Sequence, residues 1–170
     1  MAARTVALCI ALLHDDNPTP ASIEQVLRAH GEPGPFHLTP TDLTQLKAAA
    51  QKLTAVFASS QDPDQSATLL NNLLTTTANP PRLTSHQGTT TWHLHVDAED
   101  DTPWADWFLA QSAMALATLF ADQQRLPGGL CASPTCGKPY LDTGGGSPRR
   151  YCSTRCATRE RVAAHRATRP

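Results

Sequence analysis

Four cysteines gathered near one end of the chain constrain its fold more than any other feature. The stretch CASPTCGKPYLDTGGGSPRRYCSTRC, residues 131–156, holds four of the five cysteines. Four residues separate the first pair and three separate the second, with fifteen between the pairs. Two close pairs joined by a short loop suit a tetrahedral zinc ion held by thiolates at about 2.3 Å. The predicted ligands of this one structural zinc ion are Cys131, Cys136, Cys152 and Cys156, which leave no open position for catalysis.

Disulfide bonds are the other use of clustered cysteines, but they persist mainly in oxidising compartments. An apolar run at residues 6–13 is the best candidate for a secretion signal, yet HDDNPTP follows it instead of a small-residue cleavage site. No apolar run approaches the roughly 20 residues that cross a bilayer. We therefore expect a cytoplasmic protein without membrane association. Residues 6–13 then form a buried first element, with Cys9 as a small hydrophobic side chain.

Charge divides the chain into two parts. Residues 1–130 carry 6 Lys and Arg against 13 Asp and Glu, a net charge of −7, whereas residues 131–170 carry 8 against 2, a net charge of +6. A basic segment beside an acidic body is typical of a nucleic-acid-binding appendage, although it can also dock on an acidic protein surface. Because RLPGGL at residues 125–130 interrupts any helix, we expect a domain over residues 1–126 and a second over 127–170.

Helix start signals recur through the acidic part. A Thr or Asp followed by Pro marks starts near residues 20, 40, 63 and 104, and the apolar spacing carries these helices to about residues 31, 58, 78 and 124. The last helix is apolar on nearly every side and is expected to be central. Alternation around residues 91–96 predicts a β-hairpin between residues 82 and 97. The fold class is therefore mainly α with a small β-hairpin.

The cysteine-rich segment has its own local pattern. Residues 138–143 can form a strand, residues 144–148 a turn and residues 149–152 a return strand. A helix that follows Ser153 would carry Cys156 in its first turn, where backbone N–H groups stabilise thiolates. Knuckle, hairpin and helix in this order predict a treble-clef-like four-cysteine zinc finger behind the helical N-terminal domain.

The acidic part offers little recognisable chemistry. His93 and His95 share one face of the predicted strand and could bind a metal, but the sequence shows no third ligand. It contains no glycine-rich phosphate loop, nucleophile elbow or metalloprotease motif. We therefore predict that the protein is not an enzyme.

The C-terminal sequence CASPTCGKPYLDTGGGSPRRYCSTRCATRERVAAHRAT resembles the CGNR zinc finger of a bacterial family of stress-induced transcription regulators. The shared features are the cysteine spacing, YLDT at residues 140–143, RRYC at 149–152 and the helix RVAAHRA at 161–167. LTPTDL at residues 38–43 and LLNNLL at 69–74 resemble the family's N-terminal domain. The Cys-Gly-Asn-Arg signature itself stands here as Cys156-Ala157-Thr158-Arg159. The resemblance implies a zinc-containing transcription regulator.

Arginines are the predicted functional groups of the finger. On a helix, Arg155, Arg159 and Arg166 fall within one narrow sector at about 100° per residue. Such a stripe could neutralise several phosphates and reach guanine edges, whereas a solvated basic face needs no ligand. The predicted DNA contacts are Arg149, Arg150, Arg155, Arg159, Arg166 and Arg169. Arg159 could instead brace the helix against Asp142.

The sequence thus predicts a DNA-binding regulator that occupies a promoter, with an N-terminal domain that responds to a small-molecule effector or a protein partner. The alternative is a zinc-stabilised protein-interaction module without direct DNA binding.

Overall fold

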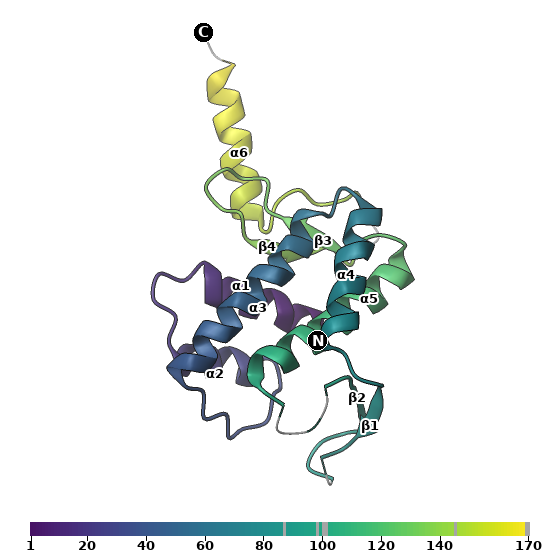
Figure 1. The fold of residues 1–170 in the computed structure, drawn as a ribbon. Helices are drawn as coiled ribbons and strands as arrows, with labels where there is room; N and C mark the ends of the chain where they lie inside the picture. Colours follow the sequence, from purple (N-terminus) through teal and green to yellow (C-terminus); the bar gives the residue numbers. More distant parts are fainter. Residues whose placement is uncertain (87, 98, 100–101, 145, 169–170) are drawn as a thin grey trace.

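The computed structural model of the chain describes residues 1–86, 88–97, 99, 102–144 and 146–168 (Figure 1). The described part is mainly helical with two small antiparallel sheets, as the sequence predicted. The helices are α1 (Ala2–Leu13), α2 (Pro20–Ala29), α3 (Pro40–Ala58), α4 (Pro63–Thr77), α5 (Trp104–Gln123) and α6 (Thr154–Ala167). The strands are β1 (Arg82–Thr84), β2 (His93–His95), β3 (Gly128–Leu130) and β4 (Pro139–Leu141).

The predicted helix starts are confirmed for α2, α3 and α4. Each of these helices has a proline in its first turn and a side-chain cap from Thr19, Thr39 or Asp62. At α3 the hydroxyl of Thr39 accepts from the backbone N–H of Asp42 at 3.2 Å, and the Asp42 carboxylate accepts from the Thr39 N–H at 2.9 Å. These reciprocal bonds satisfy two backbone donors that a helix end otherwise leaves without partners.

Helix α5 lies at the centre of the fold, as its apolar sequence predicted. It packs against α1, α3 and α4, and every residue from 107 to 113 is buried. Polar side chains in this run need partners, and the hydroxyl of Thr5 on α1 donates to Ser112 at 2.9 Å. The predicted buried first element is confirmed in α1, where Leu8, Cys9 and Leu12 join the core.

The β1–β2 hairpin forms where alternation predicted it, with Leu83 opposite Leu94. The face it turns to the body carries histidines, and His95 is buried. The apolar face points outward, where Trp92 is 73% exposed, Leu83 67% and Leu94 48%. Alternation of apolar and polar residues in the sequence locates the hairpin, but it does not indicate which face packs against the body of the protein.

The second sheet corrects the hairpin predicted within the finger. Strand β4 pairs with β3, which precedes the first cysteine, and residues 149–152 form no return strand. That segment is held beside β4 by side chains. The Tyr140 hydroxyl donates to the Arg149 carbonyl, and the Asp142 carboxylate accepts from the Arg149 backbone N–H at 2.9 Å.

Gly128 explains why β3 takes the place of the predicted return strand. A Cβ atom at this position would lie 2.1 Å from the carbonyl oxygen of Tyr140, so only glycine allows the two backbones to approach this closely. Gly128 and Gly129, which were expected to mark the domain boundary, are therefore part of the sheet. The domain limits at residues 126 and 127 remain a prediction, since β3 contacts α3 and β4 contacts α1.

Truncation after Arg125 tests whether residues 1–126 fold without the finger. We expect the fragment to keep cooperative helical unfolding, because α1 to α5 bury their own apolar faces. The fragment lacks Leu126, which is 2% exposed in the intact chain. It should therefore be about 2–5 kcal/mol less stable by circular dichroism in denaturant. Leu126→Ala in the full chain is the matched control. Loss of all helical signal from the fragment would place the finger inside the core of a single domain.

Candidate metal centre

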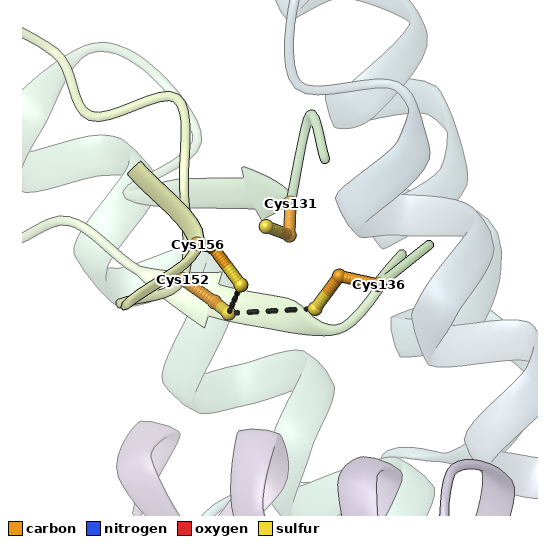
Figure 2. A group of neighbouring side chains, drawn as sticks. All are labelled: Cys131, Cys136, Cys152 and Cys156. Carbon is orange, nitrogen blue, oxygen red and sulfur yellow. Dashed lines mark hydrogen bonds between the residues drawn. The ribbon is translucent and has the colours of Figure 1, made fainter. Parts of the chain in front are cut away.

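Four cysteine side chains converge from three parts of the finger (Figure 2). Cys131 follows β3 directly, and Cys136 lies in the loop between β3 and β4. Cys152 lies before α6, and Cys156 is the third residue of that helix. Their sulfur atoms all lie within 4.8 Å of one another.

The first cysteine pair sits on a short knuckle. The N–H of Cys131 donates to the carbonyl of Lys138 at 2.9 Å, and the N–H of Cys136 donates to the carbonyl of Ser133 at 2.9 Å. Gly137 then adopts φ +60°, a left-handed conformation that favours glycine. This turn directs the chain from Cys136 into β4.

The second pair is placed by the start of α6, as predicted. Ser153 caps the helix, and its hydroxyl accepts from the N–H of Cys156 at 3.3 Å. Cys156 therefore lies at a helix N-terminus, where the helix dipole and unpaired N–H groups favour a thiolate.

The sulfur geometry fits one zinc ion and excludes disulfides. Cys152 Sγ lies 3.6 Å from Cys136 Sγ and 3.8 Å from Cys156 Sγ, and all cysteines are free thiols. A disulfide needs about 2.05 Å. Four thiolates at about 2.3 Å around a tetrahedral zinc ion would lie about 3.8 Å apart. The four cysteines therefore suit one structural zinc ion, which would link the knuckle to α6.

Electrostatics also call for a cation at this centre. Burial and hydrogen bonds with neighbouring thiols raise the pKa of Cys152 to about 12, whereas a hydrogen bond with Ser153 lowers the pKa of Cys156 to about 7. Four thiolates this close repel one another, so a divalent ion is needed for all of them to be deprotonated together at neutral pH.

Two of the predicted DNA-contacting arginines make bonds inside the finger. Arg159 donates to the hydroxyl of Ser133, to the Glu160 carboxylate at 3.3 Å and to Cys156 Sγ at 3.7 Å. It thereby connects the knuckle to α6, and Glu160 accepts from the same Ser133 hydroxyl. Arg149 donates to the carbonyl of Cys152 at 2.9 Å.

The remaining predicted arginines are more open. Arg150 lies over the ring of Tyr151, with 5.9 Å between its guanidinium carbon and the ring centre. Arg155 and Arg166 are exposed on α6, and their side chains make no hydrogen bond or ion pair with any described residue. Arg161, which was not among the predicted DNA contacts, is also exposed, and its side chain has no hydrogen-bond or ion-pair partner among the described residues. Arg169 lies outside the described residues.

A second cluster of possible metal ligands lies in the N-terminal part. His93 and His95 were considered from sequence, and the structure adds His86, with the ligand nitrogens of all three within 4.8 Å. His86 follows the end of β1, so only the register of the hairpin brings it beside the other two. Burial lowers the pKa of His95, and Asp97 opposes this effect.

Comparisons with known families agree with this architecture. A family model described as "CGNR zinc finger" matches residues 129–169, and the ABATE model, described as "Putative stress-induced transcription regulator", matches residues 5–123. The chain belongs to the ABATE family. Its pairing with a CGNR finger makes it a zinc-binding regulator in general terms, and neither description is enzymatic.

Two further findings complete the comparison. Among curated proteins, none matches the sequence significantly. Across the described helices, none is both long and apolar enough to span a membrane.

Replacing Cys136 with Ser tests the metal centre. The variant should lose one equivalent of zinc per chain in metal analysis and should unfold the finger, because zinc binding of about 10–16 kcal/mol supplies its folding energy. Cys9→Ala changes a buried thiol outside the cluster and should keep that zinc. A metal-free wild-type protein with four reactive thiols and an intact α6 would contradict the assignment.

Arg159→Ala tests the bonds around Cys156. Because a hydrogen bond to a charged group contributes about 1.5–3 kcal/mol, the variant should release zinc to a chelator faster than the wild type. Arg161→Ala removes the same charge from α6 without touching the centre and should release zinc at the wild-type rate. Equal rates for both variants would show that Arg159 does not support the metal centre.

Proposed function

We propose that the protein is a transcription regulator that binds DNA through the arginine-bearing helix of its zinc finger. The observation that carries this proposal is the position of α6, which projects away from the body of the protein (Figure 1). Its only buried residue is Cys156, and residues 161–167 are all exposed. A helix presented in this way has the size and access needed to enter a major groove.

The charge of α6 supports the same proposal. Arg155 and Arg166 lie on one face, and Val162, 43% exposed, lies between them on that face. Guanidinium groups without an internal partner can bind phosphate in bidentate fashion, and an apolar neighbour can contact a thymine methyl group. The acidic N-terminal domain would avoid the DNA and leave the finger as the contacting part.

The proposed regulation lies in the N-terminal domain. A cavity of about 540 Å³ is lined by residues of α1, β2 and α5, among them Arg4, His95 and Trp107. It offers a place for a small-molecule effector, whereas a protein partner would use the outer surface of the domain.

The salt dependence of DNA binding tests the proposed contacts. Each phosphate contact that is lost should reduce the slope of log affinity against log salt by about 0.9. Arg155→Ala and Arg166→Ala should each show this reduction at unchanged zinc content, because neither side chain has a hydrogen-bond or ion-pair partner among the described residues. Arg161→Ala removes the same charge from a different face of α6 and should reduce the slope less.

Two results would contradict the proposal. If the three Arg→Ala variants had the same slope of log affinity against log salt, the basic finger would attract DNA in general, without a defined contact face on α6. A folded, zinc-loaded wild type that binds no genomic fragment at low salt would exclude DNA binding, and the protein-interaction module would then take its place.

A further inference from the structure

Three histidines of the β1–β2 hairpin meet at the wall of the N-terminal cavity. Their ring centres lie 4.8 Å apart for His93 and His95, 4.9 Å for His86 and His95, and 5.1 Å for His86 and His93. All three line the cavity, and each offers a ring nitrogen within 4.8 Å of the others. The hairpin β1–β2, which carries the cluster, and helix α6, which begins at the cysteine centre, lie at opposite ends of the molecule (Figure 1).

Hydrogen bonds set the tautomers of two of these rings. His93 Nδ1 lies 2.7 Å from the carbonyl of Thr91, which can only accept, so this nitrogen carries the proton. His95 Nδ1 lies 2.8 Å from the carboxylate of Asp97 and donates to it in the same way. In the neutral rings both Nε2 atoms therefore keep their lone pairs available.

Those two nitrogens lie close together. The Nε2 atoms of His93 and His95 lie only 3.0 Å apart, which is unfavourable unless a cation lies between them. A proton shared by these two nitrogens would join only two of the three converging rings. Two imidazoles bound to one ion at about 2.0–2.1 Å would place their nitrogens about 2.9–3.4 Å apart for common coordination angles. The observed separation fits that range.

The surroundings resemble the outer shell of a metal site. Ligating histidines generally donate their other N–H to a carboxylate or a backbone carbonyl, as His95 and His93 do here. The Asp97 carboxylate is buried and also accepts from Arg82 at 3.5 Å. Such partners orient the rings before any ion arrives.

The cavity beside the cluster contains polar groups that still lack partners. Gln111 is 4% exposed, and its amide nitrogen has no hydrogen-bond partner among the described residues. The hydroxyl of Thr90 is buried and likewise has no partner among them. Both residues line the cavity. Buried polar groups are normally satisfied, so these atoms point to an occupant such as water or a ligand.

We propose that His86, His93 and His95 bind a divalent first-row transition-metal ion, with at least one coordination position accessible from the cavity. Imidazole suits zinc, iron, nickel and copper ions, and three imidazoles without thiolate separate this site chemically from the four-cysteine centre. Asp97 is a positioning residue that orients His95.

Metal stoichiometry tests this proposal in the full-length protein, with zinc as the probe. In excess zinc, the wild type should bind two equivalents per chain by equilibrium dialysis. His86→Gln and His93→Gln should each bind one, and Cys136→Ser should also bind one. His165→Gln, on the exposed surface of α6, is the matched control and should bind two. Asp97→Asn should weaken the second site by about 10- to 100-fold.

A second measurement does not depend on the folding of the variants. Zinc added to the zinc-loaded wild type should shift the ¹⁵N resonances of His86, His93 and His95 and leave those of His165 unchanged. A wild type that binds only the zinc of the finger, or unshifted histidine resonances in excess zinc, would overturn the proposal. Neither readout involves DNA, so the outcome is independent of the proposed function.

Discussion

Mutual repulsion of four thiolates governs how the finger can be built. Helix α6 has one buried residue, Cys156, and therefore almost no apolar contact that could hold it in place. An isolated helix of this length is marginal in water. Its attachment must come from the ion that joins Cys156 to the other cysteines, together with the Ser153 cap and the bonds of Arg159 and Glu160 to Ser133. The direction in which α6 projects thus depends on coordination geometry and polar contacts, without a hydrophobic core.

This mode of attachment separates the arginines by position. Arg149 and Arg159 lie beside the centre and donate to backbone or side-chain acceptors of the finger. The side chains of Arg155 and Arg166 are exposed and have no hydrogen-bond or ion-pair partner among the described residues. Arg149 and Arg159 restrict the orientation of α6. Each of the other two side chains, Arg155 and Arg166, would lose about 2 kcal/mol of conformational entropy if a ligand fixed it.

Features set by local chemistry could be predicted from the sequence. Helix starts depend on residues such as Thr39 and Asp42 that are neighbours in the chain, and the cysteine spacing is itself a ligand geometry. The pairing of β3 with β4 could not be predicted, because it depends on the close approach of Gly128 to Tyr140 across the knuckle. His86 was missed for a similar reason, since it belongs to no strand and meets the other histidines only through the hairpin register.

Helix α5 connects the two ends of the molecule. It begins with Trp104 at the cavity and ends at Gln123, so at 1.5 Å per residue it is about 30 Å long. The chain then passes through buried Leu126 into β3, and Cys131 follows directly. A shift of this packed helix would therefore displace a ligand of the metal centre. Suppose that α5 can adopt two alternative placements. A ligand in the cavity changes the finger only if it binds one placement more tightly than the other, because equal affinities shift no population. Gln111 lies on α5 and lines the cavity, and its amide nitrogen has no hydrogen-bond partner among the described residues.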